Sequence, residues 1–469
     1  MFSDFAEYLR HRIADVSLMH GWLPATVHLV TVVALAGGIG WRWRRASLLP
    51  LPVGIGLGAA LAVSLNCYLG TTGLIGGPPP GALWAWLVLT GVPVGAVALG
   101  WRRMRWRRRA SALAATVLCL LSAALVLNAW VGYVPTVYSA WNQLTAAHLP
   151  HQTDEATVAA MQRGRVIPTN GVIVPVDVAA NVSHFPHRGE LVYLPPSWFA
   201  SSPPPPLPVV MMIGAEINTP ADWVRIGGAA STADAYAAAH GGNAPVLVFV
   251  DSGGTFGVDT ECVNGTRGNA ADHLTKEVVP FMIAHFDVSA APARWGVAGF
   301  STGGTCALDL TVMHPDVFNA FVDIAGDASP NAGNKVQTIA RLFGGDAKAW
   351  ASFDPYHVIT NHGRYQGVSG WFAVAPSSNR EANLGGQDGA AHSLCELGRA
   401  YGLECAVIAQ PGNHDWTFAT AAFSAALPWL AGRLGTPDST PLPLPANTTS
   451  SPPPAIVQAN RGSGVRPVP

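Results

Sequence analysis

The sequence has little charge for its length. Only 12% of its 469 residues are Asp, Glu, Lys or Arg, whereas about 25% is usual in soluble proteins. The formal net charge is −1, so the chain as a whole has no electrostatic attraction for nucleic acids or acidic polymers. It also lacks a Cys-x-x-Cys pair and a Cys/His cluster, so no sequence pattern indicates a metal site.

Charged side chains are missing from the interiors of four long apolar segments near the N-terminus. Each segment is close to the roughly 20 residues that a membrane-spanning helix needs. We therefore predict a short N-terminal segment (residues 1–22) and four transmembrane helices within residues 23–132. The four segments are residues 23–41, 47–70, 82–100 and 110–132.

Arginines flank these segments unevenly. Three lie within residues 42–45 and six within residues 102–109, whereas the loop of residues 71–81 has no Lys or Arg. Loops rich in Lys and Arg stay in the cytoplasm, so both clusters are expected there. Four spans then predict a multi-pass protein of the cell membrane, with everything after residue 132 outside the cytoplasm.

The six cysteines divide between the two parts of the chain. Cys67 and Cys119 lie in apolar segments. The other four allow two disulfides if the later part is extracytoplasmic, and buried free thiols are the alternative. Two of these four, ten residues apart, could close a short loop. The later cysteines are Cys262, Cys306, Cys395 and Cys405.

After a polar linker (residues 133–171), residues 172–435 alternate between strand and helix patterns. Residues 172–195 are typical of antiparallel edge strands, and the later apolar runs are typical of buried parallel strands. This alternation predicts an α/β domain with a mostly parallel sheet. Residues 436–469 are rich in Pro, Ser and Thr and are predicted to be a disordered tail. The expected parallel strands are residues 208–213, 245–250, 295–300, 318–324, 370–375 and 405–409, with helices at 229–239, 270–286 and 305–313.

A nucleophile motif follows one of these strands. Residues 299–304 read Gly-Phe-Ser-Thr-Gly-Gly, with an apolar strand before Ser301 and a helical pattern after it. The sharp turn of a nucleophile elbow needs glycines beside the serine, and it exposes the serine oxygen at the carboxyl end of the sheet. Ser301 is therefore the predicted nucleophile.

The serine needs a base, which in this fold follows the last strand. His414 lies in the loop after residues 405–409, and we predict that it is the base. The other histidines after the serine sit in less suitable places, on helices or before a strand. They are His314, His357, His362 and His392.

An acid should follow the strand at residues 370–375 and orient the histidine. Glu381 is the preferred candidate because it lies on the first loop after that strand. Asp388 and Glu396 are the alternatives. Asp415 is too close to His414 in sequence to reach its ring.

An oxyanion hole needs two preorganised backbone N–H groups. Thr302, directly after the nucleophile, and Ala215, after the strand at residues 208–213, are the predicted donors. Glu216 follows in the same loop, and it is either structural or in contact with substrate.

Three motifs resemble one known family. Residues 182–188 and 192–196 are similar to the opening strands of the putative-esterase family, which includes esterase D and the antigen 85 mycolyltransferases. Residues 299–304 match its nucleophile motif, and residues 412–416 resemble its Gly-x-His-x-Trp ending. The resemblance covers residues 175–432.

This resemblance implies an α/β-hydrolase fold, no cofactor, and Ser301 and His414 as catalytic residues. Members similar to esterase D carry the acid where Glu381 stands, whereas mycolyltransferases carry it on a segment like the one around Glu396. Mycolyltransferases also have an acidic residue before the oxyanion-loop glycine, where it helps bind trehalose. Ile213 occupies that position here, which argues against trehalose as the acceptor.

The function predicted from the sequence is a membrane-anchored serine esterase that forms an acyl-enzyme with an acylated lipid or envelope ester outside the membrane. An envelope acyltransferase with the same residues is the first alternative, and a catalytically silent membrane scaffold is the second. Four spans joined to such a domain, in a chain rich in Ala, Gly, Pro, Trp and Arg, also resemble membrane esterases of mycobacteria and related actinobacteria.

Overall fold

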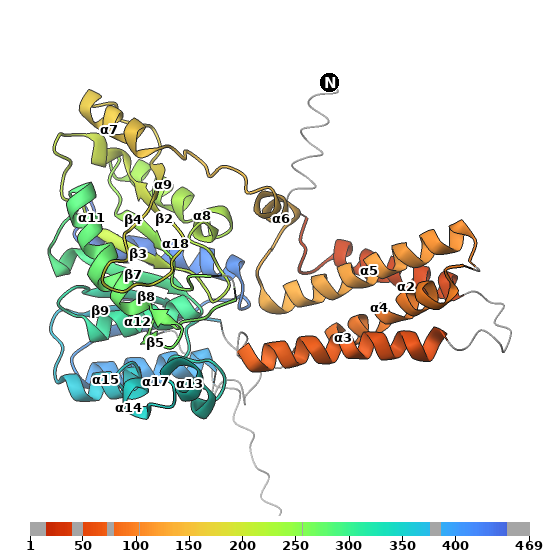
Figure 1. Ribbon diagram of the computed structural model, residues 1–469. Coiled ribbons are helices and arrows are strands. Elements are labelled where there is room, and N and C mark those ends of the chain that lie inside the picture. Colours follow the sequence, from red (N-terminus) through yellow and green to blue (C-terminus); the bar gives the residue numbers. More distant parts are fainter. Residues whose placement is uncertain are drawn as a thin grey trace, which may run out of the picture.

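The structure is a computed structural model that describes residues 16–39, 50–72, 79–102, 104–255, 257–375 and 386–447. Figure 1 shows two parts side by side, an α/β part and a bundle of long helices that extends away from it. Most of the predicted N-terminal segment, the first arginine cluster and most of the Pro-rich tail lie outside the described residues.

Three helices of the bundle are long and apolar enough to cross a membrane. They cover Leu51–Thr71, Gly81–Gly100 and Trp106–Val131, whereas the apolar helix at Trp22–Ala36 is shorter. The described residues therefore support membrane association through three helices, and the fourth predicted span stays a prediction. The bundle helices are α2 (Trp22–Ile39), α3 (Pro50–Thr72), α4 (Gly81–Gly100) and α5 (Trp106–Val131).

The last bundle helix begins earlier than predicted. α5 starts at Trp106, so three arginines lie in its first turn rather than in a loop before it. Long basic side chains can reach toward water from the end of a membrane helix. The arginine cluster therefore did not show where α5 begins.

Close backbone contacts hold neighbouring bundle helices together. A Cβ atom at Gly91 would lie 2.0 Å from the backbone oxygen of Gly54 and 2.4 Å from the backbone nitrogen of Gly58. Only glycines allow this approach of α3 and α4, as is common between membrane helices. Thr31 of α2 and Ser122 of α5 also share a hydrogen bond of 3.0 Å between their hydroxyls.

The α/β part is built on an eight-stranded sheet of order β1-β2-β4-β3-β7-β8-β9-β10. β1 and β2 are antiparallel to their neighbours, and the six strands from β4 to β10 run parallel. The prediction of an α/β fold with a mostly parallel sheet and antiparallel edge strands is confirmed. The strands are β1 (Val172–Val176), β2 (Glu190–Leu194), β3 (Val209–Ile213), β4 (Val246–Val250), β7 (Trp295–Phe300), β8 (Ala320–Ile324), β9 (Ser369–Val374) and β10 (Glu404–Ala409).

Helices cover both faces of the sheet, and each face carries its own buried apolar cluster. A parallel sheet buried on both faces needs strands that are apolar throughout, which is why these strands read as continuous apolar runs. The helix predicted at residues 270–286 is divided by a π-helical stretch. The principal helices are α9 (Ala229–Ala239), α10 (Ala270–His273), the π-helical turn Leu274–Val278, α11 (Val279–Phe286), α12 (Thr302–Met313), α17 (Gln387–Ala400) and α18 (Trp416–Arg433).

Shorter elements connect these units. The predicted linker contains two helices, α6 and α7, and three helices lie between β8 and β9. The shorter elements are α6 (Val137–Leu144), α7 (Glu155–Gly164), η2 (Pro196–Phe199), α8 (Asp222–Arg225), β5 (Asn264–Gly265), β6 (Gly268–Asn269), η4 (Pro292–Arg294), α13 (Lys335–Phe343), α14 (Ala347–Ala351) and α15 (Pro355–His362).

Two disulfides form within the α/β part. Cys262 in the loop after β4 is bonded to Cys306 of α12, and Cys395 of α17 is bonded to Cys405 of β10. The second bond closes the short loop that the spacing allowed. The alternative of four buried thiols is therefore wrong for this structure.

The chain after α18 returns to the edge of the sheet. The Asn447 side-chain oxygen accepts a hydrogen bond of 3.2 Å from the Val407 N–H of β10, the last strand in the sheet. It also accepts one of 2.9 Å from the Arg399 guanidinium. At least one residue beyond the last helix, Asn447, thus packs against the α/β part.

Candidate active site

Ser301 occupies a sharp turn between β7 and α12. Its φ of +58° is unusual for a residue with a side chain, and such backbone strain is common at functional sites. The motif glycines make the turn possible. A Cβ at Gly299 would lie 1.8 Å from the Gly303 oxygen, and one at Gly303 would lie 2.2 Å from the Ile213 oxygen.

The structure brings His414 to this serine. The loop between β10 and α18 places His414 Nε2 2.9 Å from Ser301 Oγ. On the other side of the ring, Nδ1 lies 3.1 Å from the side-chain oxygen of Gln387. An amide oxygen accepts, so Nδ1 carries the proton and Nε2 is free to take one from the serine.

The surroundings of His414 favour its neutral form. Neighbouring protein removes water from part of the ring and lowers the pKa of His414, while the Asp327 and Asp415 carboxylates oppose this shift. The Phe300 ring lies 5.0 Å from the imidazole, although the residue as a whole remains exposed. A neutral imidazole is the form that acts as a general base.

None of the acid candidates is seen to contact His414. Glu381 lies outside the described residues. Asp388 is buried and its Oδ1 lies 3.5 Å from His392 Nε2, while Glu396 is exposed on α17. Gln387, which the sequence analysis did not consider, contacts the histidine instead.

The neighbour of the base has a structural role. The Asp415 side chain accepts a hydrogen bond of 2.9 Å from the Phe418 N–H and caps α18. A capping carboxylate stabilises the start of a helix. Asp415 therefore acts on His414 only through its charge.

The backbone N–H groups of the two predicted oxyanion donors differ in whether they already have a hydrogen-bond acceptor. Thr302 is the first residue of α12, where a backbone N–H has no partner within the helix. The Ala215 N–H donates to the Asn218 side-chain oxygen at 2.9 Å. An oxyanion would therefore have to share or replace this bond, and sequence reasoning did not identify Asn218.

Several carboxyl groups affect one another close to this loop. Burial, followed by the charge of Asp259, raises the pKa of Glu216 to about 9, and Arg267 opposes the shift. Burial and Asp259 also raise the pKa of Glu261. A protonated carboxyl donates a hydrogen bond, so Glu216 presents both a donor and an acceptor at neutral pH. Of these carboxyl groups, only Glu216 could be linked to the site from the sequence.

A polar hollow of about 360 Å³ adjoins the site. Asp327, Asn331 and Asp354 line it together with Gly386, which precedes Gln387. Lys335, also in the lining, places its ammonium 3.8 Å from the centre of the Trp350 ring. The hollow therefore offers hydrogen-bonding groups and an ammonium group that lies over an aromatic ring.

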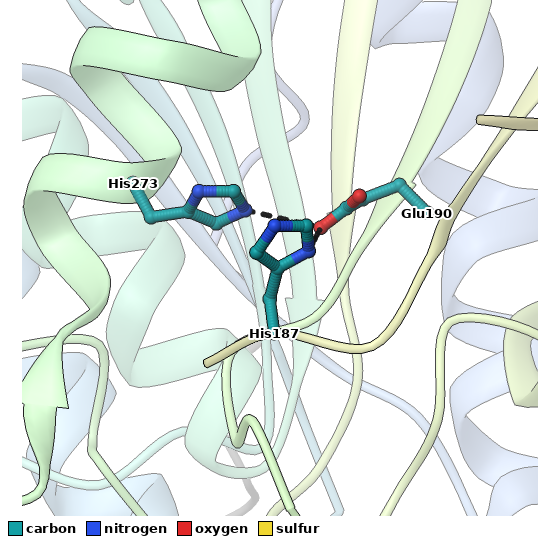
Figure 2. Close-up of side chains that lie close together, drawn as sticks. All are labelled: His187, Glu190 and His273. Carbon is teal, nitrogen blue, oxygen red and sulfur yellow. Dashed lines mark hydrogen bonds and ion pairs between the residues drawn. The ribbon is translucent and has the colours of Figure 1, made fainter. Parts of the chain in front are cut away.

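A second group of polar side chains lies at the start of β2 (Figure 2). Glu190 Oε1 is 2.9 Å from His187 Nδ1 and 3.0 Å from His273 Nε2, and Glu277 Oε2 is 2.8 Å from His273 Nδ1. His187, Glu190 and His273 have ligand atoms within 4.8 Å of one another, which is the spacing that a shared metal ion needs.

The arrangement of the two rings does not suit a shared metal ion. The His187 and His273 rings are stacked, with centres 4.1 Å apart and planes only 22° from parallel. A metal ion lies in the plane of each imidazole that binds it, and planes stacked in this way meet only far from the rings. The group is therefore best described as a buried hydrogen-bonded network.

Comparison with known proteins identifies the family. A family model described as Putative esterase matches residues 187–430, which is more than half of the chain. The chain belongs to the Putative esterase family. This membership confirms the resemblance seen in the sequence and makes the protein a carboxylic ester hydrolase of the serine type.

Three known proteins are similar to this chain. An uncharacterized protein of Corynebacterium glutamicum is 28% identical over 330 residues, 68% of this chain and 75% of that protein. An S-formylglutathione hydrolase from Agrobacterium tumefaciens is 17% identical, with 57% of this chain and 97% of that chain covered and a TM-score of 0.47. MPT51 (FbpC1) of Mycobacterium tuberculosis is 18% identical, with coverages of 55% and 99% and a TM-score of 0.38.

Proposed function

We propose that the protein is a membrane-anchored esterase that cleaves an acylated lipid or envelope ester through an acyl-enzyme on Ser301. The observation that carries the proposal is the hydrogen bond between Ser301 and His414 at the strained turn after β7. A hydroxyl held against a neutral imidazole is an activated nucleophile. In this fold, that pair carries out acyl transfer.

The chemistry follows from the positions of these groups. His414 Nε2 takes the proton from Ser301 Oγ as the oxygen attacks the ester carbonyl. The oxyanion accepts hydrogen bonds from the N–H groups of Thr302 and Ala215. His414 then gives its proton to the leaving alcohol, and water attacks the acyl-enzyme with the same histidine as base.

Glu381 remains our proposed acid. Gln387 already holds Nδ1 in the protonated state, but an amide does not balance the charge of the imidazolium that forms during catalysis. A carboxylate does so. Glu381 belongs to the segment before Gly386, and that segment leads directly into the contact with His414.

We further propose four membrane spans, with α2 as the first, and an α/β part outside the cytoplasmic membrane. The arginines before and within the first turn of α5 support this orientation. The two disulfides support it independently, because such bonds persist in oxidising compartments. An ester at the outer face of the cytoplasmic membrane is then within reach of the site.

Labelling with a fluorophosphonate probe tests this function in the detergent-solubilised full chain. Ser301→Ala should abolish labelling and lower ester hydrolysis by about 10⁴-fold or more. Labelling that persists in Ser301→Ala would contradict the assignment. Adding a candidate alcohol to the assay separates hydrolysis from transfer, because a transferase would yield the acylated alcohol.

A further inference from the structure

The end of the last membrane helix contacts the candidate catalytic centre directly. α5 ends at Val131, and Gly132 caps it with a φ of +72°. A Cβ at this glycine would lie 2.5 Å from the backbone oxygen of His414 and 2.8 Å from the Asp415 side chain. The Gly132 carbonyl also accepts a hydrogen bond of 3.4 Å from the Trp416 N–H. The bundle therefore packs against the loop that carries the base.

The next residue contacts the opposite side of the site. The Tyr133 hydroxyl donates to Asp222 Oδ2 at 3.0 Å, and the amide of Gln143 in α6 donates to Asp222 Oδ1 at 2.6 Å. The Gln143 amide also lies 2.6 Å from the Tyr133 hydroxyl. Two side chains from the segment that leaves the bundle thus hold one buried carboxylate.

That carboxylate lies at the start of α8 and binds the loop that carries Ala215. Asp222 Oδ2 accepts from the Thr219 N–H at 2.7 Å and from the Asn218 amide at 3.3 Å. The oxygen of the same Asn218 amide accepts the Ala215 N–H. A continuous chain of hydrogen bonds therefore runs from Tyr133 to the predicted oxyanion donor.

The exit turn is itself held in one conformation. The Asn128 side chain, in the last turn of α5, donates to the Val134 carbonyl and accepts from the Val134 N–H, both at 2.8 Å. These paired bonds fix the chain direction on either side of Gly132 and Tyr133. A displacement of α5 would therefore be transmitted to both catalytic loops.

We propose that Gly132 and Tyr133 are positioning residues for the esterase reaction, coupling the membrane helices to the base loop and the oxyanion loop. The inference rests on the proposed function of Ser301 and His414. Tyr133 orients Asn218 through Asp222 and so determines whether the Ala215 N–H can turn toward an oxyanion. Gly132 packs against the His414 backbone and so fixes the position of His414 relative to Ser301.

The test uses Tyr133→Phe in the full chain, with Tyr138→Phe as the matched control. Tyr138 lies in the same exit segment but is 57% exposed. We expect Tyr133→Phe to lower kcat about tenfold with little change in KM, because small misplacements of catalytic groups reduce turnover strongly. Tyr138→Phe should match the wild type. The fluorophosphonate labelling rate should fall in parallel with kcat.

Gly132→Ala provides a second, different readout. Its added methyl group pushes on the His414 backbone, so the pH–rate profile should shift along with a fall in kcat, whereas Tyr133→Phe should keep the wild-type profile. Both variants must retain the wild-type Tm within a few degrees. Should Gly132→Ala fail to fold, Tyr133→Phe alone decides the matter.

The outcomes separate this inference from the proposed function. Wild-type kcat in a folded Tyr133→Phe variant overturns the coupling, while loss of labelling in Ser301→Ala leaves the esterase assignment intact. Labelling of Ser301→Ala overturns the esterase assignment instead. A uniform loss in both tyrosine variants would also contradict the coupling, because Tyr138 does not reach Asp222.

Discussion

At the scale of single residues, the neighbours of His414 affect it in two different ways, through a hydrogen bond and through charge. Gln387 fixes the tautomer through the Nδ1 contact, and Asp327 and Asp415 act only through charge. A carboxylate in contact with the ring would additionally stabilise the imidazolium. Glu381 and Glu396 can therefore be distinguished by substitution.

We expect Glu381→Gln to lower kcat by about 10²–10⁴-fold, because the imidazolium loses its counter-charge in the transition state. Glu396→Gln should stay within about twofold of the wild type, since Glu396 is exposed on α17. Steady-state ester hydrolysis measures both. Equal losses in the two variants, or a loss confined to Glu396→Gln, would assign the acid differently.

The motif glycine Gly303 should be intolerant of any side chain. Gly303→Ala places a methyl group 2.2 Å from the backbone oxygen of Ile213, and overpacking of this kind costs about 1–3 kcal/mol or more. Thermal unfolding should show a lower Tm than in Gly164→Ala, whose methyl group meets only ordinary contact at 3.4 Å. Equal Tm values would show that the turn can relax.

At the scale of elements, β2 and α10 are joined by the buried network of Figure 2. The hydrogen bond with Glu190 raises the pKa of His187 to about 9, against partial desolvation. Burial would raise the pKa of Glu277, but hydrogen bonds from Ser183 and His273 outweigh it and lower the pKa to about 2. The network thus combines a stabilised cation and a stabilised anion.

The stability from His187 should depend on pH. Its folded-state pKa of about 9 exceeds the unfolded value of 6.5, so its contribution is complete below pH 6.5 and is lost as the pH rises through about 9. The Tm should therefore fall more between pH 6.5 and 9 in the wild type than in Glu190→Gln. His285→Gln, which alters an exposed pair, should keep the wild-type slope. Parallel slopes in all three proteins would contradict the prediction.

The two disulfides should differ in what they contribute to the free energy of unfolding. They close loops with sequence separations of 44 and 10 residues, for which chain entropy gives about 4 and about 3 kcal/mol. Replacing Cys262 and Cys306 by alanine should therefore lower the Tm more than replacing Cys395 and Cys405. The reverse order would show that local packing, not loop length, sets the difference.

At the scale of the whole molecule, the placement of the α/β part outside the membrane is the main untested prediction. A reporter fused after residue 447 that functions only when exported should be active, because an even number of spans separates it from the outside N-terminus. A reporter that functions only in the cytoplasm should be silent. Activity of the cytoplasmic reporter alone would reverse the proposed orientation.

The sequence predicted the sheet well because most residues of each strand are apolar and buried. It also placed Ser301 and His414 on the correct connections, since the motif glycines and the final loop are local features. Local patterns could not reveal contacts between distant segments. Gln387, Asn218 and Gly132 meet the site only through the folded chain, and the network of His187 with His273 joins residues more than 80 positions apart.

The position of Asn447 at the edge of β10 bears on self-association. An outermost strand offers its backbone groups to any other extended chain, and proteins often cover such edges to avoid aggregation. Here, the segment after α18 supplies an acceptor to the Val407 N–H. A chain cut just after α18 would lose this acceptor, so we expect it to self-associate more readily through the β10 edge than the full chain does.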